Sequence, residues 1–401
     1  MSSRSRVSAA VGFVVLSFGT GAVAPIEEPV PDEIALEVGA PVAAFPATLE
    51  SSATGTAASV AGATTASARA VPPPPLNLYG GALGPGLAPG VADIPVRVYV
   101  PNSAAGTLSV IDPTTYAVVD RFPVGKVPHH VTPSWDLSRL YVNNTESNTF
   151  TVIEPRSGKP MEEIAVTDPY NLYFTPDGSK AIVVAERYQR LDFYDPTSWQ
   201  FLKSVSIPWP GVDHGDFTAD GRYFLASTEF SGQVVKVDTE VMELAGRLTV
   251  GGLPIDVKVS PDGAVAYVTN QGRHGVSIVD PVSMTEIGFL RTGAGAHGLN
   301  VSRDALSMYV SNRLEGSITV IDLATRSVRT TWPVGGSPDM LQVTADGTQL
   351  WASNRFHGSV SVIDTTTGAV LHTIATGGGA HGLSIFPQPG NHSIGHNGVY
   401  R

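Results

Sequence analysis

The sequence predicts an all-β fold, a seven-bladed β-propeller with four-stranded antiparallel blades. A short apolar run that ends in an acidic residue occurs seven times, at Asp112, Glu154, Asp195, Asp238, Asp280, Asp322 and Asp364. Successive acids are 42, 41, 43, 42, 42 and 42 residues apart, and a period of roughly 40–45 residues is typical of propeller blades. The composition agrees: Gly and Pro account for 42 and 31 of the 401 residues, and charged residues for only 15%, which argues against helical bundles and coiled coils.

Each repeat carries the signals of four short strands and no helical period. The run that ends in the acid, as in 318–322, alternates in polarity and predicts the third strand. Thirteen residues before most of the acids, Tyr-Val-x-Asn motifs such as 267–270 and 309–312 predict the second strand. Asp-Gly pairs at 177–178, 262–263 and 346–347 predict the turn before it. The fourth strand follows the acid. We expect the acids and the motif Asn residues to bond turn backbone.

The two ends of the repeat region predict that the ring is closed. The first recognisable strand, at 96–100, corresponds to the second strand of a repeat and has no first strand before it. The last, at 382–386, corresponds to a first strand with no second strand after it. The C-terminal strand should therefore complete the first blade and remove an exposed sheet edge. An open solenoid, the alternative, would leave two ends that need caps.

Composition divides the chain into four segments. Arg4 and Arg6 precede an apolar stretch at 7–16, and Ala22-Val23-Ala24 resembles a cleavage site, so residues 1–24 are predicted to be a signal peptide. An uncleaved anchor is the alternative, but the apolar run is shorter than the roughly 20 residues of a membrane span. Residues 25–93, rich in Ala, Pro, Ser and Thr, should form a disordered leader. Residues 94–387 form the propeller and 388–401 a C-terminal tail.

Charge and cysteine content exclude several function classes. The net charge of −11 lacks the basic footprint of a nucleic-acid-binding protein. The absence of Cys rules out disulfides, iron–sulfur clusters, thiolate zinc sites and a cysteine nucleophile. We expect a monomer that is secreted or held at the extracytoplasmic cell surface, with no stable membrane span.

The starts of the predicted innermost strands hold the candidate site. Five of the ten histidines fall there, in the pairs His129-His130, Tyr170-Asn171, Asp213-His214, Ile255-Asp256, Ala296-His297, Pro338-Asp339 and Ala380-His381. Because these starts meet at one mouth of the central channel, we predict that binding residues are His129, His130, Asn171, Asp213, His214, Asp256, His297, Asp339 and His381. Imidazoles that converge in this way can ligate copper, iron or zinc. The predicted metal ligands are His130, His214, His297 and His381, with the aspartates as ligands or orienting groups.

Other interpretations of these residues stay open. The His-Gly pairs are also what a turn into the first strand requires, and a polar ring around a water-filled channel needs no metal. A channel histidine is equally suited to acid–base chemistry without metal. Arg313 and Arg355 follow the motif Asn in two repeats, as anion ligands or as exposed rim residues. The tail either places His396, a further candidate binding residue, over the mouth or stays loose.

The motif Tyr267-Val268-Thr269-Asn270 resembles the namesake of the YVTN-repeat β-propeller family, and the resemblance covers about residues 92–387. It implies a secreted or surface-attached bacterial or archaeal propeller. Related propeller architecture occurs in streptogramin lyase, nitrous oxide reductase and the haem domain of nitrite reductase. This chain resembles nitrous oxide reductase in its inner-strand histidines, including an adjacent pair, but it has fewer candidate ligands and no Cys for a thiolate copper domain.

Three functions are consistent with these observations. The first is an exported module that binds a small molecule, a metal ion or a protein partner at the histidine-bearing mouth. The second is a metal-dependent enzyme, an oxidoreductase or a lyase, that uses the channel histidines. The third is a structural interaction propeller. The sequence does not decide whether the protein is an enzyme, and the cofactor is unknown beyond copper, iron or zinc.

Overall fold

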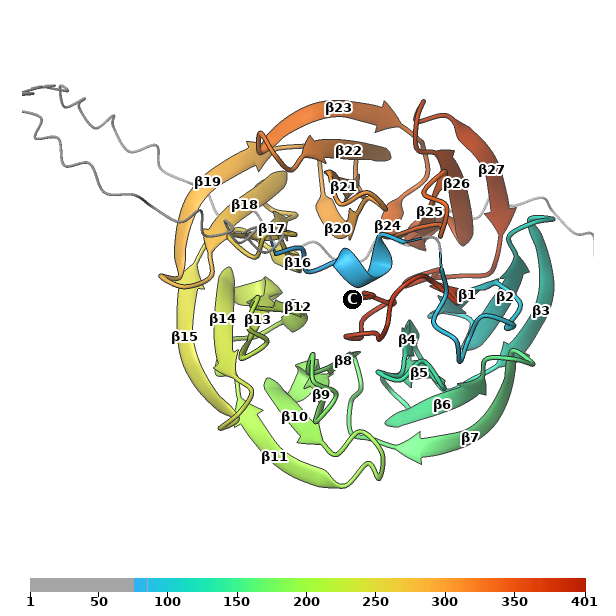
Figure 1. Cartoon of the computed structure of the whole chain (residues 1–401), viewed down its shortest axis with the longest axis horizontal. Coiled ribbons are helices and arrows are strands. Elements are labelled where there is room, and N and C mark those ends of the chain that lie inside the picture. Colours follow the sequence, from blue (N-terminus) through green and yellow to red (C-terminus); the bar gives the residue numbers. More distant parts are fainter. Residues whose placement is uncertain (1–75, 85) are drawn as a thin grey trace, which may run out of the picture. The chain divides into compact units, whose positions relative to one another are not determined.

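The computed structural model describes residues 76–84 and 86–401, so the predicted signal peptide and most of the predicted leader lie outside the described residues. Seven four-stranded antiparallel sheets are arranged around a central channel (Figure 1). The predicted fold class is confirmed. In this described part, the helices are three-residue turns, η1 (Gly80–Ala82), η2 (Glu186–Tyr188), η3 (Glu229–Ser231) and η4 (Arg355–His357), and none is long or apolar enough to cross a bilayer.

The blades are numbered in chain order, each from its innermost strand outwards. Blade 1 contains β28 (Ser384–Phe386), β1 (Arg97–Asn102), β2 (Thr107–Asp112) and β3 (Ala117–Pro123). Blade 2 contains β4 (Pro128–Pro133), β5 (Leu140–Asn144), β6 (Thr149–Glu154) and β7 (Lys159–Ala165). Blade 3 contains β8 (Asn171–Phe174), β9 (Ala181–Ala185), β10 (Arg190–Tyr194) and β11 (Phe201–Ser206). Blade 4 contains β12 (Val212–Phe217), β13 (Tyr223–Thr228), β14 (Gln233–Asp238) and β15 (Glu243–Thr249).

The last three blades follow the same order. Blade 5 contains β16 (Pro254–Val259), β17 (Ala266–Asn270), β18 (Gly275–Asp280) and β19 (Thr285–Arg291). Blade 6 contains β20 (Ala296–Val301), β21 (Ser307–Asn312), β22 (Ser317–Asp322) and β23 (Ser327–Pro333). Blade 7 contains β24 (Pro338–Val343), β25 (Gln349–Asn354), β26 (Ser359–Asp364) and β27 (Val370–Ala375).

The repeat residues have the structural roles that the sequence predicts. The Asp112 carboxylate accepts the Thr114 N–H at 2.8 Å, and the Asp280 carboxylate accepts the Val282 N–H at 2.8 Å. The Asn312 side chain accepts the Gly293 N–H at 3.1 Å and donates to Thr319 Oγ1 at 3.0 Å. Each motif therefore ties a loop to its own blade.

The C-terminal strand closes the ring. β28 pairs antiparallel with β1, with Val98 opposite Ile385 and Tyr99 opposite Ser384. Val98 and Ile385 pack with the fully buried Trp351 of β25, which joins blade 7 to blade 1. The first and the last strand of the repeat region, β1 and β28, thus share one sheet, and the predicted closure of the ring is confirmed.

Each innermost strand has one sheet edge without a strand partner, on the channel side, and side chains from the preceding blade satisfy much of it. Tyr173 of β8 accepts the Gly215 N–H at 2.9 Å, and Asp216 of β12 accepts the Val259 N–H at 2.8 Å. Asn300 of β20 accepts the Val343 N–H at 3.3 Å, and Gln342 of β24 accepts the Ile385 N–H. Because unpaired backbone groups are costly when buried, these bonds require polar side chains inside the channel.

The C-terminal tail satisfies the edge of β8. Its residues 393–400 form a hairpin in which Gly398 N–H bonds the Gly395 carbonyl at 3.1 Å, with Ser393 bridged to Tyr400. The Phe174 N–H donates to the Ile394 carbonyl at 3.0 Å, and the His396 N–H donates to the Leu172 carbonyl at 2.7 Å. The hairpin therefore enters the channel and extends the edge of blade 3.

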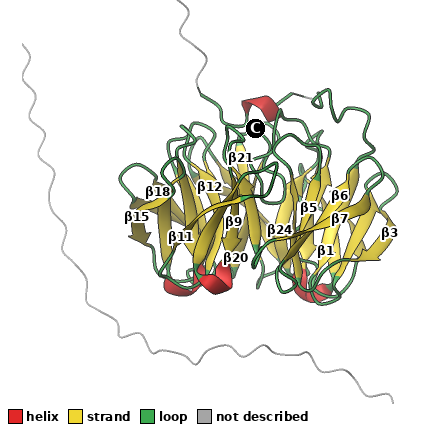
Figure 2. Ribbon diagram, turned by 90° about the horizontal axis from the view of Figure 1, so that it is seen from below, coloured by secondary structure: helices red, strands yellow, loops and turns green. Residues whose placement is uncertain are grey.

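A segment before the first blade covers the same end of the channel as the tail. Leu78 N–H bonds the Pro261 carbonyl at 2.8 Å, and Tyr79, Ala82 and Val91 are buried. The side view in Figure 2 places η1 beside the C-terminal end, opposite the face that bears the other three helical turns. Residues 76–84 and 86–93, which the sequence predicts to belong to a disordered leader, instead pack on the propeller through the apolar side chains of Tyr79, Ala82 and Val91.

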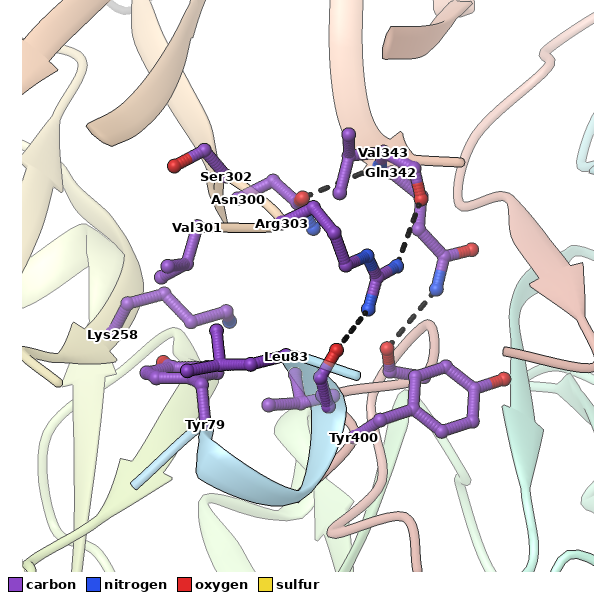
Figure 3. Close-up of a pocket in the computed structure, with 13 residues that line it drawn as sticks. Tyr79, Leu83, Lys258, Asn300, Val301, Ser302, Arg303, Gln342, Val343 and Tyr400 are labelled. Atoms are coloured by element: carbon purple, nitrogen blue, oxygen red, sulfur yellow. Dashed lines mark hydrogen bonds between the residues drawn. The ribbon is translucent and has the colours of Figure 1, made fainter. Parts of the chain in front are cut away.

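A small cavity remains between η1, the hairpin and blades 5 to 7 (Figure 3). Arg303 crosses it to donate to the Ala82 carbonyl at 3.2 Å, and Gln342 donates to the Gly398 carbonyl at 3.0 Å. The cavity volume is about 50 Å³, which accommodates water molecules and is too small for an organic cofactor.

We predict that Gly395→Ala detaches the hairpin. Gly395 has φ +105°, and a β-carbon there would lie 2.5 Å from the Leu172 carbonyl oxygen. The variant should lose roughly 1–3 kcal/mol in the free energy of unfolding and become sensitive to proteases within 391–401. Denaturant titration and limited proteolysis measure both effects. Gly335→Ala is the matched control, since Gly335 also has positive φ but no atom within 4 Å of its β-carbon position. Equal protease resistance in the two variants would contradict the prediction.

Candidate functional site

Strand pairing defines which channel residues are equivalent. The aligned pairs are Pro128–Asn144, Val212–Thr228, Pro254–Asn270, Ala296–Asn312, Pro338–Asn354 and Ala380–Asn102. We define the first ring as the residues that directly follow Pro128, Val212, Pro254, Ala296, Pro338 and Ala380, together with Tyr170 of blade 3. Its members are His129, Tyr170, Asp213, Ile255, His297, Asp339 and His381. The next residue belongs to the second ring: His130, Asn171, His214, Asp256, Gly298, Met340 and Gly382.

This register differs from the sequence alignment in three blades. The pairs that begin at Ala296, Pro338 and Ala380 are displaced by one residue relative to the other four. The sequence matched His297 and His381 to His130 by residue type, whereas strand pairing matches them to His129. His130 and His214 therefore lie one residue deeper in the channel than His297 and His381.

A β-bulge re-aims the residues at the start of the inner strands. The register shifts between Pro128 and Val131 in blade 2 and between Val212 and Gly215 in blade 4, and the same shift occurs in blades 5, 6 and 7. A regular strand would send neighbouring side chains to opposite faces, but a bulge adds one residue and breaks the alternation. The adjacent residues His129 and His130 consequently join the same cluster.

Six histidine rings form one contiguous cluster in the channel. The centroid of His130 lies 5.1 Å from that of His214, 5.1 Å from that of His396 and 4.9 Å from that of His381. The His129 and His381 centroids are 4.8 Å apart, and those of His214 and His297 are 6.4 Å apart. Five of these histidines come from the predicted strand starts, and the sixth comes from the tail.

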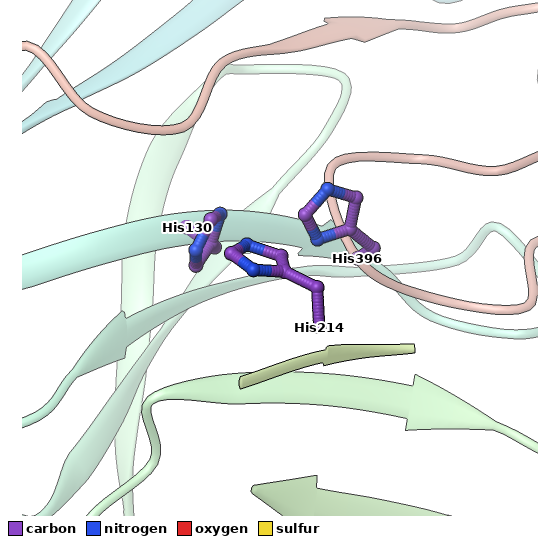
Figure 4. Close-up of side chains that lie close together, drawn as sticks. All are labelled: His130, His214 and His396. Atoms are coloured by element: carbon purple, nitrogen blue, oxygen red, sulfur yellow. The ribbon is translucent and has the colours of Figure 1, made fainter. Parts of the chain in front are cut away.

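His130, His214 and His396 form the tightest group (Figure 4). One nitrogen from each lies within 4.8 Å of the others, and all three side chains are buried. His130 Nδ1 lies 2.9 Å from Asn397 Oδ1, which selects the Nδ1–H form, and His130 Nε2 is buried with no hydrogen-bond partner. A lone pair is therefore directed into the cluster.

His214 has a comparable arrangement. The Nδ1 atom of His214 lies 2.6 Å from Asp213 Oδ1, which is within ion-pair distance, but the two atoms do not form a regular hydrogen bond. The Nε2 atom of His214 has no hydrogen-bond partner. Both His396 nitrogens face amides: Nδ1 lies 3.1 Å from Asn171 Nδ2, and Nε2 lies 3.2 Å from Asn397 Nδ2. A carboxylate or amide behind an imidazole is the usual support of a metal-binding histidine.

His396 reaches the cluster from the end of the channel opposite the predicted mouth. β28 runs away from the mouth, so the chain emerges at the far end and turns back as the hairpin. The backbone of His396 has φ +53°, as the tight turn requires. Gly382 leaves space for the turn of the hairpin, since a β-carbon at Gly382 would lie 2.5 Å from both Asn397 Oδ1 and His130 Nδ1. The sequence analysis predicts His396 as a candidate binding residue over the mouth, whereas the structure brings it to the cluster from the other end of the channel.

Burial keeps these histidines neutral. Desolvation lowers the pKa of His130 to about 3 and that of His214 to about 4. It also holds the pKa values of His129, His297, His381 and His396 well below the usual range. Neutral imidazole is the form that ligates metal ions, so the cluster needs no proton release from these rings at neutral pH.

The remaining predicted site residues have defined partners. Asp339 lies between Arg313 (Nη1 at 2.9 Å), His381 (Nε2 at 3.3 Å) and His297 (Nδ1 at 3.5 Å). Asp256 is committed to the buried Lys258 at 3.0 Å and to the Leu299 N–H at 2.9 Å. The ion pair of Asp256 with Lys258 therefore has a structural role.

A further ring at the mouth carries charges that the sequence analysis did not bring together. Each blade contributes one residue to this ring, directly after the motif Asn or, in blades 3 and 4, after the residue that replaces it. In blade order these residues are Ser103, Thr145, Glu186, Glu229, Gln271, Arg313 and Arg355. We call these the mouth ring. Glu186 and Glu229 were missed because their repeats have lost the Tyr-Val-x-Asn motif. Their distance from the repeat acid was the available signal.

The two glutamates of the mouth ring hold protons near neutral pH. Burial, followed by the charge of Asp213, raises the pKa of Glu186 to about 7 and that of Glu229 to about 8. Burial also raises the pKa of Asp213 itself well above its usual range. Arg313 is not an exposed rim residue, since its side chain is 11% exposed and bonds Gln271 Oε1 at 2.6 Å.

Fold and site together define a seven-bladed β-propeller whose channel holds a buried cluster of neutral histidines. The family model described as YNCE-like beta-propeller matches residues 81–388, and the chain belongs to this family. No curated protein matches the sequence.

Solved structures share the fold at low identity. Hydrazine synthase from Kuenenia stuttgartiensis is 18% identical, with a TM-score of 0.57 over 64% of this chain and 88% of that chain. A functionally unknown protein from Desulfotomaculum acetoxidans is 18% identical, with a TM-score of 0.61 over 72% and 98%. The dihydro-heme d1 dehydrogenase NirN in complex with DHE is 15% identical, with a TM-score of 0.56 over 72% and 74%. At these identities the likeness concerns the fold.

We predict that Glu229→Gln flattens the dependence of stability on pH. A carboxyl whose folded-state pKa is raised binds more protons when folded than when unfolded. Its contribution to stability is therefore greatest at low pH and is lost as pH rises towards about 8. Between pH 6.5 and 8.5 the wild type should lose roughly 1–2 kcal/mol more than the variant, since one pKa unit corresponds to about 1.4 kcal/mol.

Denaturant titrations across that range measure the difference. Glu186→Gln should act in the same direction but level off near pH 7. Glu146→Gln, at an exposed position of blade 2, is the control and should leave the wild-type curve unchanged. Parallel curves for wild type and Glu229→Gln would contradict the prediction.

Proposed function

We propose that this protein binds a transition-metal ion in its central channel, with His130, His214 and His396 as ligands. The observation that carries the proposal is the convergence of three buried, neutral imidazoles whose candidate ligand nitrogens lie within 4.8 Å of one another. His130 Nε2 and His214 Nε2 are buried without a partner. Buried polar atoms are nearly always hydrogen-bonded, so two partnerless nitrogens in one cluster favour an ion between them.

Ligand chemistry favours copper or zinc. Imidazole suits copper, zinc, iron and nickel, and among divalent ions copper binds nitrogen ligands most tightly. Binding through His396 replaces one of its amide contacts, with Asn171 or Asn397. Three protein ligands leave a fourth position, as in catalytic zinc sites. His381, whose Nδ1 has no partner, has its ring centroid 4.9 Å from that of His130 and lies nearer the mouth.

We also propose that the protein is exported and acts as a monomer outside the cytoplasm. The support is the charged and apolar pattern of residues 4–16 and the Ala22-Val23-Ala24 site. The Tyr-Val-x-Asn repeats, which resemble those of YVTN-repeat propellers, favour the same location. N-terminal sequencing of protein recovered from the extracytoplasmic fraction should start at Pro25. An intact Met1 or Ser2 in that fraction would contradict cleavage, and recovery only from the cytoplasm would contradict export.

The metal site is tested by isothermal titration of metal-stripped protein with Cu²⁺ and with Zn²⁺. Wild-type protein should bind one equivalent, with copper tighter than zinc. His214→Ala and His396→Ala should each weaken copper binding by about 100-fold or more, since loss of even an orienting neighbour costs a metal site roughly 10–100-fold. Thermal melting of the apo proteins checks that both variants fold.

His372→Ala is the matched control. His372 lies on the outermost strand β27 and stacks on Tyr116 at 3.7 Å, remote from the channel cluster. The control should retain wild-type affinity. Folded His214→Ala and His396→Ala variants with unchanged copper affinity would overturn the proposed site.

A further inference from the structure

We propose that the channel mouth is a binding site for a small zwitterion. Its cationic group would face Glu186, Glu229 and Asp213, and its anionic group would face Arg313 and Arg355. The proposal goes beyond the metal site and does not require it, because the mouth ring and the first ring lie nearer the entrance than the three-histidine group.

Charge around the mouth ring is sorted by blade. Glu186 and Glu229 come from the neighbouring blades 3 and 4, and Arg313 and Arg355 come from the neighbouring blades 6 and 7. Gln271 of blade 5 lies between the two pairs on one side, and Ser103 and Thr145 of blades 1 and 2 lie between them on the other. In Figure 1, blades 3 and 4 lie across the channel from blades 6 and 7. The entrance therefore has an acidic half and a basic half.

Buried polar atoms without a hydrogen-bond partner occur in both halves, and Asp339 Oδ2 in the basic half is one of them. On the acidic side, Asp213 Oδ1 lies 2.6 Å from His214 Nδ1 without a regular hydrogen bond, and the Asp213 side chain is only 4% exposed. On the basic side, the Nε–H of Arg313 is a buried donor without a partner. An ammonium group donates, and a carboxylate accepts.

Both arginines of the mouth ring have contacts within the basic half. Arg313 is held by Asp339 at 2.9 Å, and Arg355 Nη1 lies 3.3 Å from His381 Nε2. Burial and the charge of Asp213 raise the pKa of Glu229, while the charges of Arg313 and Arg355 lower it. An ammonium group of a ligand beside Glu186 and Glu229 would favour the ionised form of these carboxyl groups.

Ligand chemistry follows from this arrangement. A simple anion would meet Asp339 between the arginines, and a simple cation would leave the basic half unused. A molecule with an ammonium at one end and a carboxylate at the other satisfies both halves. Charge-assisted hydrogen bonds of this kind are the strong ones, so both ends should contribute to affinity.

The test uses metal-stripped wild-type protein in low salt, titrated with glycine, β-alanine, 4-aminobutyrate and 6-aminohexanoate. Butyrate and butylammonium serve as probes that carry one charge each. We expect at least one zwitterion to bind roughly tenfold to a hundredfold more tightly than either single-charge probe. The best chain length then measures the separation of the two halves.

Variants assign the two ends. Glu186→Gln/Glu229→Gln should weaken binding of the best zwitterion and of butylammonium by about tenfold or more, with butyrate unaffected. Arg355→Gln should weaken the zwitterion and butyrate by a similar factor, and it leaves the Arg313–Asp339 pair intact. Lys126→Gln/Glu146→Gln, at exposed positions of blade 2, is the control and should bind like the wild type.

Two results would overturn the proposal. One is that no zwitterion binds more tightly than butyrate or butylammonium. The other is that the folded Glu and Arg variants keep wild-type affinity. Because all titrations use stripped protein, failure of the metal site leaves this outcome unchanged, and failure here leaves the copper titration unchanged.

Discussion

The unpaired inner edge of each blade is the constraint on which the rest of this structure depends. The closing strand β28 completes blade 1, but the seven innermost strands, β28 among them, still present backbone groups to the channel. Tyr173, Asp216, Asn300 and Gln342 satisfy the edge of the next blade, and the C-terminal hairpin satisfies the edge of β8. Polar side chains inside the channel are therefore required by the fold. The candidate site occupies positions that were already polar for a structural reason.

The hairpin links this constraint to chemistry. The backbone bonds that satisfy β8 also place His396 beside His130 and His214, and they place Asn397 where its amide oxygen meets His130 Nδ1 at 2.9 Å. Gly382 and Gly395 allow the approach, because a side chain at either position would collide with a neighbour. Burial then keeps the imidazoles neutral, and the β-bulges direct consecutive residues into one cluster. Each of these features has a structural cause, and together they produce a donor set suited to a metal ion.

Much of the fold, and part of the site, could be predicted from the sequence. The period of about 42 residues and the unpaired first and last strands determine the blade number and the closure, because these depend on local patterns repeated seven times. The equivalence of His297 with His129 was missed because the histidines were matched by residue type, although each lies seven residues before the Asp of the following turn, Asp304 and Asp136. His381 is followed by no such turn. The contribution of His396 depends on a long-range contact with β8 that no repeat encodes. Glu186 and Glu229 were hidden because degenerate repeats lose the motif that marks their position.

The central claim is that the three histidines bind one metal ion. Anomalous diffraction at the copper edge, from crystals of copper-loaded protein, tests it most directly. The account predicts one strong peak in the channel, within about 2.0–2.2 Å of a nitrogen of His130, of His214 and of His396, as for other imidazole–metal bonds. The account would be contradicted if the protein in the crystals carried one equivalent of copper and the peak lay at surface histidines, such as His357 or His372, with no peak in the channel.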